Sequence, residues 1–268
     1  MEYCSINIEP LKSFDDGLPV YFLTGKKHLY QTLFCIQSLT RISDQRFRFI
    51  LVDDGSFNKT ILRRIGRQIP DAEIITKEII EKNLEEQLPK KDFASIHHKR
   101  KVYPHIKKLV DIHLLGITDW KLVLDSDMLF WKEPTAIVEW LKDPKVPLYM
   151  KDCEESYGYS TDLMQSLTLR SIPSLINVGV IGLNSQAINW SSIEEWIKVL
   201  EGEEGTSYYL EQALTAMIIS ESEKFTMLNA LEYIVNPSKK MVEDRQGILH
   251  HYVDLSKESY FKYAWKNL

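Results

Sequence analysis

Two carboxylates, two residues apart, interrupt an apolar stretch in the middle of the chain. Asp125 and Asp127, with Ser126 between them, follow the apolar residues 120–124 and precede the apolar residues 128–131. Such a run is typical of a buried strand, where a charge is costly unless a partner compensates it. Residues two apart on an extended chain point to the same side, so we expect two adjacent carboxylates whose repulsion a divalent cation would relieve. Oxygen ligands favour a hard ion such as Mg²⁺ or Mn²⁺.

A short acidic triplet is a weak signal by itself, because many such triplets are solvated turns. Here apolar residues flank the triplet on both sides, and it is the only Asp-x-Asp of the chain. We therefore interpret Asp125 and Asp127 as ligands rather than as part of a polar turn.

The residues before the triplet alternate between two kinds of pattern. Residues 19–24 and 48–52 are β-branched and aromatic runs typical of strands, and residues 73–80 contain a third strand. Residues 28–41 and 59–69 have apolar positions at helical spacing. This alternation predicts an α/β fold with a mostly parallel sheet flanked by helices, in which ligands bind at the carboxyl ends of the strands.

Polar residues follow three of these strands. Thr24 and Gly25 come after the first strand, Asp53 and Asp54 after the second, and the acidic triplet after the central one. Because the carboxyl ends of parallel strands meet at one edge of a sheet, the three clusters predict one shared site.

Residues 81–104 are polar and basic. We interpret this run as a solvated, charge-rich face, with a flexible loop near an anionic ligand as the alternative. A helix is expected from Tyr103 to residue 115, because Pro suits the start of a helix. Its Lys107, Lys108 and His113 are candidates to face the site, where a lysine would act as a point charge on a phosphate.

The second half of the chain continues with helix and strand patterns. Residues 134–141 are expected to form a helix, residues 146–150 and 176–184 strands, and residues 152–175 a long functional loop. Tyr157 and Tyr159 in that loop could stack on a sugar ring or simply pack. Two glycines in the 176–184 strand would allow another group to approach its backbone closely.

Helices are expected over residues 191–201 and 208–219, and the second carries Glu211 and Gln212 among apolar neighbours. These two need partners: either a ligand, or a cap or buried hydrogen bond. A strand region is expected over 225–235 and a last strand over 247–253. Its consecutive histidines, His250 and His251, point to opposite faces, so at most one can reach a shared metal.

Composition limits the classes of function. A net charge of −5 gives no electrostatic case for nucleic acid as a partner. The three cysteines lack zinc-ligand spacing and suggest a reducing compartment. The N-terminus shows no signal-peptide pattern, and no apolar run approaches the roughly 20 residues of a membrane span. We therefore predict a cytoplasmic protein without a transmembrane segment.

Taken in chain order, the motifs resemble those of GT-A-fold glycosyltransferases. The Asp-Asp-Gly-Ser of residues 53–56 resembles the motif after the second strand of family 2 enzymes, and residues 124–129 resemble the metal-binding Asp-x-Asp strand. Three elements resemble the Asn-x-Gly, Asp-Gln and His-x-x-x-x-x-Lys motifs of family 8 enzymes: Asn177-Val178-Gly179, Glu211-Gln212, and His251 with Lys257. Two departures are Glu211, where family 8 has Asp, and Asp254, where its last motif usually has Gly.

The resemblance implies a single-domain, Rossmann-like GT-A fold and a metal-dependent transfer of a sugar from a nucleotide diphosphate-sugar. Residues 1–131 would form the nucleotide-sugar-binding half and residues 132–268 the acceptor-binding half. UDP would be the nucleotide. The acceptor hydroxyl could belong to a sugar, a lipid, a small molecule or a protein.

The resemblance also implies roles for single residues. Mn²⁺ or Mg²⁺ would be held by Asp125, Asp127 and His251. Residues that would contact the nucleotide-sugar are Thr24, Gly25, Asp53, Asp54, Lys108, Asp125, Ser126, Asn177 and Lys257. The lysines would add positive charge at the diphosphate, and Thr24 with Asp53 or Asp54 would hold the base and ribose.

The stereochemical outcome depends on the residues near the sugar. If the enzyme inverts, Glu211 or Asp152 would accept the proton of the acceptor hydroxyl. If it retains, as the motif order favours, Glu211 and Gln212 would face the anomeric carbon.

Three other classes of protein fit parts of the pattern. A haloacid-dehalogenase-like phosphatase also carries Asp-x-Asp, but on its first strand. A nucleotidyltransferase would need a glycine-rich first loop, of which residues 24–27 are a poor version. A non-catalytic nucleotide-sugar-binding protein would keep Asp125 and Asp127 without turnover.

Overall fold

A seven-stranded sheet forms the centre of the computed structural model, which describes residues 1–268. Its order is β3-β2-β1-β4-β7-β6-β8. The strands are β1 (Leu18–Thr24), β2 (Phe47–Asp53), β3 (Glu73–Ile75), β4 (Trp120–Leu124), β6 (Leu148–Lys151), β7 (Ile176–Asn184) and β8 (Thr226–Met227). The first four run parallel, and β7 is antiparallel to both of its neighbours, β4 and β6. The predicted α/β class with a mostly parallel sheet is confirmed.

Helices cover both faces of this sheet. Successive residues of a strand point to opposite faces, and here both faces are apolar. Val20 and Phe22 of β1 join the core under α1 (Leu29–Ile42), α2 (Lys59–Gln68) and α6 (Thr135–Lys142). Tyr21 between them joins the opposite core, under α3 (Lys77–Gln87) and α5 (Ile106–His113). Strands buried on both faces read as near-continuous apolar runs, which is why β1, β2 and β4 were predictable.

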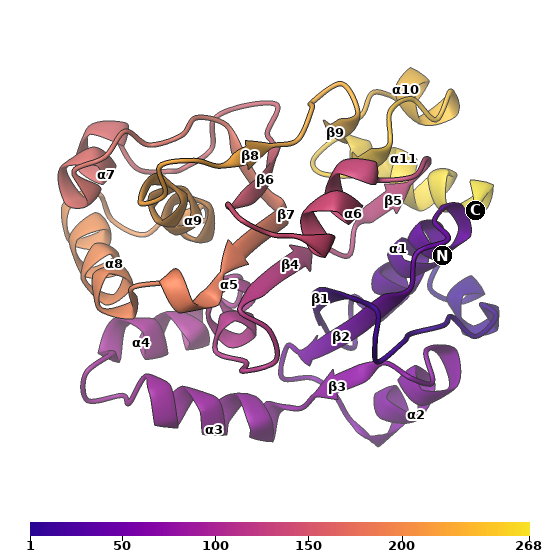
Figure 1. Cartoon of the computed structure of the whole chain (residues 1–268), viewed down its shortest axis with the longest axis horizontal. Helices are drawn as coiled ribbons and strands as arrows, with labels where there is room; N and C mark the ends of the chain where they lie inside the picture. Colours follow the sequence, from indigo (N-terminus) through magenta and orange to yellow (C-terminus); the bar gives the residue numbers. More distant parts are fainter.

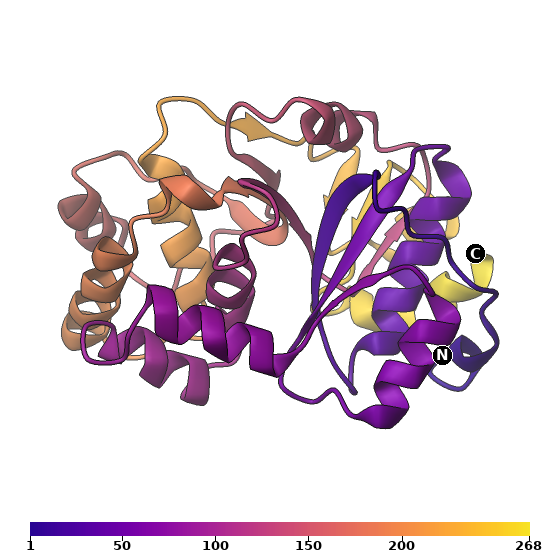
Figure 2. The same cartoon turned by 60° about the horizontal axis from the view of Figure 1, so that its bottom comes forward.

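The remaining large helices form a second group beyond α5 (Figure 1). It consists of α4 (Ala94–Val102), α7 (Thr161–Thr168), α8 (Trp190–Glu204) and α9 (Leu210–Ser220), whose apolar side chains pack with Ile181 and Leu183 of β7. Figure 2 shows this group on the left and β1–β3 with α1 and α2 on the right. Three short 3₁₀ helices cover residues Cys4–Asn7, Ser185–Ala187 and Ala264–Asn267.

A second, three-stranded sheet of order β5-β10-β9 adjoins the large one. It consists of β5 (Met128–Phe130), β9 (Tyr233–Val235) and β10 (Leu249–His251). Helix α10 (Lys239–Glu243) lies between β9 and β10 in the chain, and α11 (Ser256–Lys262) follows β10. The central strand ends at the acidic triplet, as expected, and the apolar residues after the triplet form a further strand that was not predicted. Residues 120–131 divide into β4 and β5, which belong to different sheets, and the acidic triplet links them. The charged side chains leave the ladder there because neither core offers them water.

Residues 81–104 are not a flexible loop, and the expected solvated, charge-rich face is right for most of their charged side chains, which are exposed. The range holds the end of α3 and all of α4, but Lys99 and Arg100 are buried. Lys99 pairs with Glu201 of α8, while Arg100 donates two hydrogen bonds, of 2.6 and 3.0 Å, to the buried carboxylate of Asp111. Charge alone suggested solvent exposure, but these charges are buried as pairs across helix contacts.

The loop expected over residues 152–175 contains the helix α7. Tyr157 and Tyr159 in it are 3% and 7% exposed and pack in the core around α9. Of the two expectations for these tyrosines, packing is therefore the correct one, and neither ring is free to stack on a sugar.

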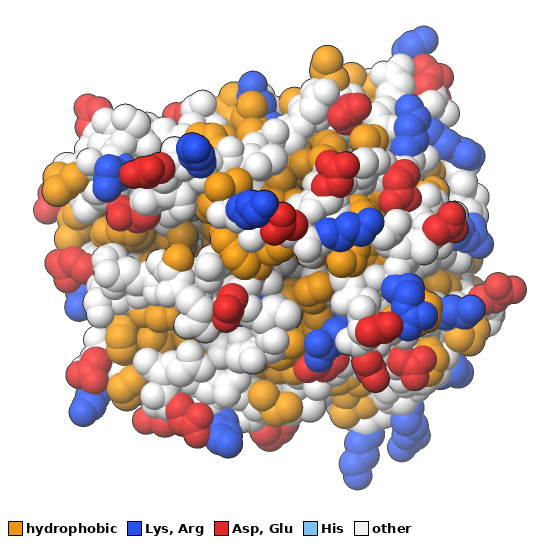
Figure 3. Space-filling view, viewed as in Figure 1, with side chains coloured by type: hydrophobic (Ala, Val, Ile, Leu, Met, Phe, Trp, Pro, Cys, Tyr) orange, Lys and Arg blue, Asp and Glu red, His pale blue; other side chains and the backbone are white.

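The two chain ends meet on the same side of the molecule (Figure 1), and Met1 and Leu268 both pack against the cluster around Phe34 and Tyr260. Charges of both signs are scattered over the face shown in Figure 3, and neither sign dominates it. None of the helices has the length and apolar character needed to cross a membrane.

Candidate active site

The acidic triplet lies where the two sheets meet. The amide of Asp125 donates to the Gly179 carbonyl of β7 over 2.9 Å, and the Asp127 carbonyl accepts from the Tyr252 amide over 3.0 Å. The backbone of Asp125 is thus fixed to the large sheet, and that of Asp127 to the residue after β10, the middle strand of the small sheet. His251, the last residue of β10, enters between the two carboxylates.

Asp125, Asp127 and His251 together form the only group of metal-ligand type in the molecule, with one ligand atom of each within 4.8 Å of the others. His251 Nε2 lies 3.4 Å from Asp127 Oδ1 and 3.6 Å from Asp125 Oδ2. Burial alone would lower the pKa of His251, but the two aspartates outweigh it and raise that pKa. Burial would likewise raise the pKa of Asp127, but His251 and Lys257 outweigh it and lower that pKa to about 2.

Two lysines flank the group. Lys257 of α11 lies 3.5 Å from Asp127 Oδ2 and is half exposed, so its ammonium group can reach a ligand. Lys108 of α5 donates to Asp125 Oδ1 over 2.7 Å and to the Val178 carbonyl over 3.0 Å. The site therefore has one positive charge on each side of the two carboxylates, Lys108 at Asp125 and Lys257 at Asp127.

A bulge in β7 makes these contacts possible. The pairing of β6 with β7 jumps from Tyr149–Ile181 to Met150–Asn177, which leaves residues 178–180 without partners on β6. A bulge of this kind re-aims backbone groups, and here it turns the carbonyls of Val178 and Gly179 toward Lys108 and Asp125. The glycine is required: a Cβ at position 179 would lie 2.5 Å from His251 Nδ1.

Glu211 lies on the other side of Lys108. Its Oε1 is 3.3 Å from Lys108 Nζ, and both side chains are largely buried. Burial raises the pKa of Glu211 to about 7, with Asp125 adding to the rise and Lys108 opposing it. Burial alone would lower the pKa of Lys108, but its two carboxylate neighbours outweigh it and raise that pKa. Lys108 is therefore a fixed cation at neutral pH, shared by Asp125 and Glu211.

Gln212, the next residue of α9, belongs to a second set of contacts. Its Nε2 donates to Asp152 Oδ2 over 3.2 Å, and Asn177 Nδ2 donates to the same oxygen over 3.0 Å. Asn177 Oδ1 in turn lies 2.9 Å from His251 Nδ1. The two sets of contacts close into a polar ring around the site, made of Asp125, Lys108, Glu211, Gln212, Asp152, Asn177 and His251.

The predicted residues after β1 and β2 mainly shape the neighbouring loop. The hydroxyl of Thr24 is buried and pairs with Thr32 of α1 over 2.8 Å. Asp53 Oδ1 accepts from the Gly55 and Phe57 amides over 2.8 and 2.9 Å. A Cβ at Gly25 would lie 2.1 Å from the Asp54 carboxylate, so a larger residue there would displace that carboxylate.

Beside this loop lies a cavity of about 160 Å³ at the carboxyl end of β2. Lys107 borders it and donates to the Asp54 carbonyl over 2.7 Å. Its other lining residues include Asp53, Gly55, Lys77 and Arg100. The structure thus brings Asp53, Asp54 and Lys107 to one cavity, while Ser126 lies half-buried in the link between β4 and β5.

Two histidines lie outside the site. His113, a candidate to face it, is buried and pairs with Ser185 Oγ over 2.8 Å, so that expectation is wrong. Burial, with Lys121, lowers the pKa of His113 to about 3. His250 points away from His251, as expected, and lies within hydrogen-bond reach of Trp131 and Gln246.

Sequence reasoning missed an aromatic rim formed by Tyr103, His105, Tyr208 and Tyr209. Neighbouring ring centres lie 5.4, 5.0 and 5.3 Å apart along this series. Tyr103 accepts from the Glu211 amide over 3.3 Å, which puts the rim beside the polar ring. The available signal was the Tyr-Tyr pair at the start of the helix that carries Glu211, and Tyr208 is 67% exposed.

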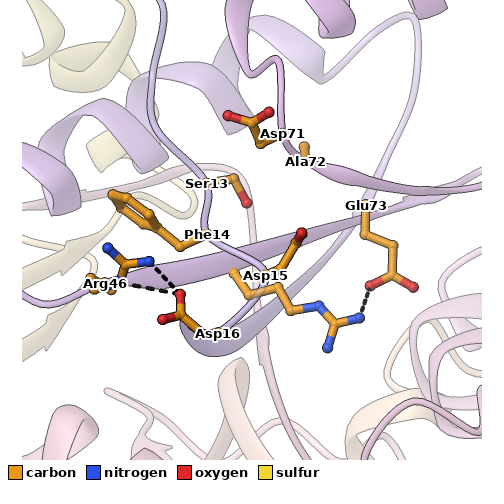
Figure 4. Close-up of a pocket in the computed structure, with 9 residues that line it drawn as sticks. Ser13, Phe14, Asp15, Asp16, Arg46, Asp71, Ala72 and Glu73 are labelled. Atoms are coloured by element: carbon orange, nitrogen blue, oxygen red, sulfur yellow. Dashed lines mark hydrogen bonds and ion pairs between the residues drawn. The ribbon is translucent and has the colours of Figure 1, made fainter.

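Another hollow lies at the opposite, amino ends of β1–β3 (Figure 4). Arg46 pairs there with Asp16, and Arg48 lies 2.6 Å from Glu73. Both arginines of this hollow are thus paired with carboxylates.

A scan of protein-family models finds no match to the sequence, and neither does a sequence search of characterised proteins. Solved structures do match. The galactosyltransferase LgtC, in complex with donor and acceptor sugar analogues, is 13% identical with a TM-score of 0.59, over 93% of this chain and 96% of that one. Mouse xyloside xylosyltransferase 1 is 13% identical with a TM-score of 0.55, over 90% and 97%. The glycosyltransferase GlyE of Streptococcus pneumoniae is 14% identical with a TM-score of 0.53, over 93% and 61%.

The chain has the GT-A fold of these glycosyltransferases. The recognition based on ordered motifs is therefore confirmed at the level of the fold. In this GT-A chain the acidic triplet follows the fourth strand.

The group formed by Asp125, Asp127 and His251 fits a hard divalent ion. Two carboxylates and one imidazole are ligands that Mn²⁺ and Mg²⁺ accept. Adjacent ligands about 2.1 Å from an octahedral ion lie about 3 Å apart, and His251 Nε2 is 3.4 and 3.6 Å from the two carboxylates. A small inward movement of the aspartates would complete the set.

Proposed function

We propose that this protein is a metal-dependent glycosyltransferase, which transfers a sugar from a nucleotide diphosphate-sugar, UDP-sugar first, to an acceptor hydroxyl. One observation carries the proposal. Asp125, Asp127 and His251 converge on one point, with Lys108 and Lys257 on either side. This arrangement suits a diphosphate with its divalent ion.

When bound, the divalent ion would act as a Lewis acid that stabilises charge on the departing nucleotide diphosphate. Asp125, Asp127 and His251 would hold it. Lys257 would contact the diphosphate directly, since its ammonium group is half exposed 3.5 Å from Asp127. Lys108 would act indirectly, because Asp125, Glu211 and the Val178 carbonyl already surround it.

The nucleoside would lie toward the carboxyl ends of β1 and β2. The cavity of about 160 Å³ there is lined by backbone and side chains of Asp53, Asp54 and Gly55 and by Lys107. Such groups can pair with a base and with ribose hydroxyls. Residues 1–131 would thus supply the nucleotide half, although His251 and Lys257 of the metal and diphosphate site come from residues 132–268.

The transferred sugar would lie between the polar ring and the aromatic rim. Glu211 and Gln212, at the start of α9, and Asn177 of β7 would border this space. LgtC has a glutamine in its active site, which one mutant replaces with glutamate, and Gln212 is our candidate for the same place in this chain. Asp152 is a poor candidate base, since its oxygens accept hydrogen bonds from Cys153, Asn177 and Gln212. Glu211 remains the candidate base for inversion, and the order of the motifs favours retention, with Glu211 and Gln212 at the anomeric carbon.

The acceptor would enter over the aromatic rim. Tyr208 and Tyr209 are exposed, and exposed aromatic faces stack on the apolar faces of sugar rings. LgtC was solved with an acceptor sugar analogue as well as a donor analogue. Among sugar, lipid, small-molecule and protein acceptors, the rim favours a sugar.

A thermal-shift panel tests the donor site. UDP, GDP, CDP and dTDP are each added with Mn²⁺ and, separately, with EDTA. A ligand that binds only the folded state adds about 2.7 kcal/mol at one hundred times its dissociation constant. We expect a shift for UDP that disappears with EDTA, followed by release of UDP from one UDP-sugar and an α- or β-linked product assigned by NMR.

The matched variants are Asp127→Asn and Asp143→Asn, because Asp143 is an exposed aspartate at the end of α6, paired only with Lys145. The first should remove the shift and the second should keep it. A folded protein that shifts with none of the four nucleotides would refute the proposal. A metal-dependent shift without turnover of any UDP-sugar would favour a non-catalytic binding protein.

A further inference from the structure

Asn177 occupies the junction between the metal ligand His251 and the opposite end of the polar ring. It is 5% exposed, and three groups contact its amide. Its Oδ1 lies 2.9 Å from His251 Nδ1 and accepts from the Gly179 amide over 2.9 Å. Its Nδ2 donates to Asp152 Oδ2 over 3.0 Å.

These contacts allow one orientation of the amide. The Gly179 N–H can only donate, and the Asp152 carboxylate can only accept. If the amide were reversed, Nδ2 would meet the Gly179 N–H and Oδ1 would meet the carboxylate, which gives two repulsive contacts. The oxygen therefore faces Gly179 and His251. Since this oxygen is an acceptor, His251 must carry a proton on Nδ1.

The protonated Nδ1 decides what the other nitrogen can do. In a neutral imidazole with Nδ1–H, Nε2 carries the lone pair, and Nε2 is the atom that faces Asp125 and Asp127. Without Asn177 the two carboxylates would favour the opposite tautomer, in which Nε2–H donates to them. That tautomer cannot bind a metal ion through Nε2.

We propose that Asn177 is a positioning residue that holds His251 in the tautomer able to bind a divalent ion. The inference rests on the proposed function for the identity of the ion. Gly179 is the second part of the device, because its missing Cβ leaves room for the His251 ring and its N–H fixes the Asn177 oxygen. Asp152 is the third, because it orients the Asn177 amide from the far side.

The test begins with the unliganded wild-type chain. Long-range ¹H–¹⁵N spectra of the histidine side chains, recorded at about pH 9 so that the ring is neutral, distinguish a protonated from an unprotonated ring nitrogen. The His251 signals are assigned by their loss in His251→Gln. We expect a protonated Nδ1 and an unprotonated Nε2. The reverse pattern in the wild-type protein would overturn the proposal without any variant.

The second measurement is Mn²⁺ affinity by calorimetry. Asn177→Ala should weaken Mn²⁺ binding by about 10- to 100-fold, the usual effect of losing such a partner of a metal-ligating histidine, and should shift His251 toward Nε2–H. Asn177→Asp keeps an oxygen for both donors but sets its other oxygen against the Asp152 carboxylate, so it should recover most of the lost affinity only together with Asp152→Asn, whose new amide can donate to that oxygen. Asn184→Ala, at the far end of β7, is the matched control and should bind Mn²⁺ as the wild-type chain does.

The two proposals fail in different ways. A wild-type chain that binds no Mn²⁺ but shows Nδ1–H would count against the proposed function and still support the role of Asn177. Wild-type Mn²⁺ affinity and an unchanged tautomer in a folded Asn177→Ala chain would overturn the role of Asn177, and would leave the donor site to the nucleotide panel.

Discussion

Replacing Gly179 by alanine tests how closely the site is built around His251. The new Cβ would lie 2.5 Å from His251 Nδ1 and Cε1 and 2.8 Å from Asn177 Oδ1, whereas ordinary contacts begin at 3.4 Å. The imidazole would have to move by about 0.9 Å (3.4 − 2.5), which exceeds the tolerance of about 0.5 Å for a working site. We expect Mn²⁺ affinity to fall by about 10- to 100-fold and overpacking to cost about 1–3 kcal/mol of stability.

Calorimetric Mn²⁺ titration and urea unfolding measure the two effects separately. The matched control is Gly116→Ala, because no atom lies within 4 Å of a Cβ at that position. A folded Gly179→Ala chain with wild-type Mn²⁺ affinity would refute the reasoning, since it would show that His251 can move without losing the ion. A loss of stability alone would mean that the ring repacks in place.

Three further expectations concern the surroundings of the site. His250→Ala leaves the Trp131 N–H and the Gln246 carbonyl without their partner, so it should lower stability by about 1–3 kcal/mol for each group left unpaired while the folded protein keeps its Mn²⁺ affinity. His251→Ala should lower the Mn²⁺ affinity of the folded protein, and calorimetry compares the two variants. Burial, with Lys121, lowers the pKa of His113 to about 3, so this residue contributes stability above about pH 6.5 that is lost as pH falls toward 3. Urea melts should show a loss of about 2 kcal/mol of stability at pH 5, and His113→Gln should remove that loss. An equal dependence of stability on pH in the wild-type chain and the variant would contradict this expectation. Asp254 has φ +44°, a conformation that favours glycine, so Asp254→Val should cost about 1–2 kcal/mol and Asp254→Gly none; equal melting temperatures for the two variants would exclude backbone strain at this position.

Much of the fold was predictable because buried strands leave a clear pattern. The runs at β1, β2, β4 and β7 are apolar on both faces, and each ends in a turn or polar residue. The order of the motifs also predicted which residues meet. Asp125, Asp127, His251, Lys108 and Lys257 come from four elements, and the structure brings them together. Their chemical roles stay predictions.

Pairing across the fold was the part that sequence could not supply. Lys99 of α4 was expected in solvent, because nothing in the sequence indicates that it pairs with Glu201 of α8. The short strand β5 after the triplet was not predicted, since it forms by pairing with β10, far along the chain. His113 was expected at the site because its hydrogen-bond partner, the hydroxyl of Ser185, follows β7 and is distant from it in the sequence.

The seam between the two sheets has a consequence for the newly made chain. When β4 and β5 leave the ribosome, the two aspartates between them have neither His251 nor Lys257, because both follow much later in the chain. Strand β5 also lacks its only sheet partner until β10 is made. Ion binding and completion of the small sheet should therefore occur together and late. A chain shortened before β10 would lack His251, the third of the proposed ligands.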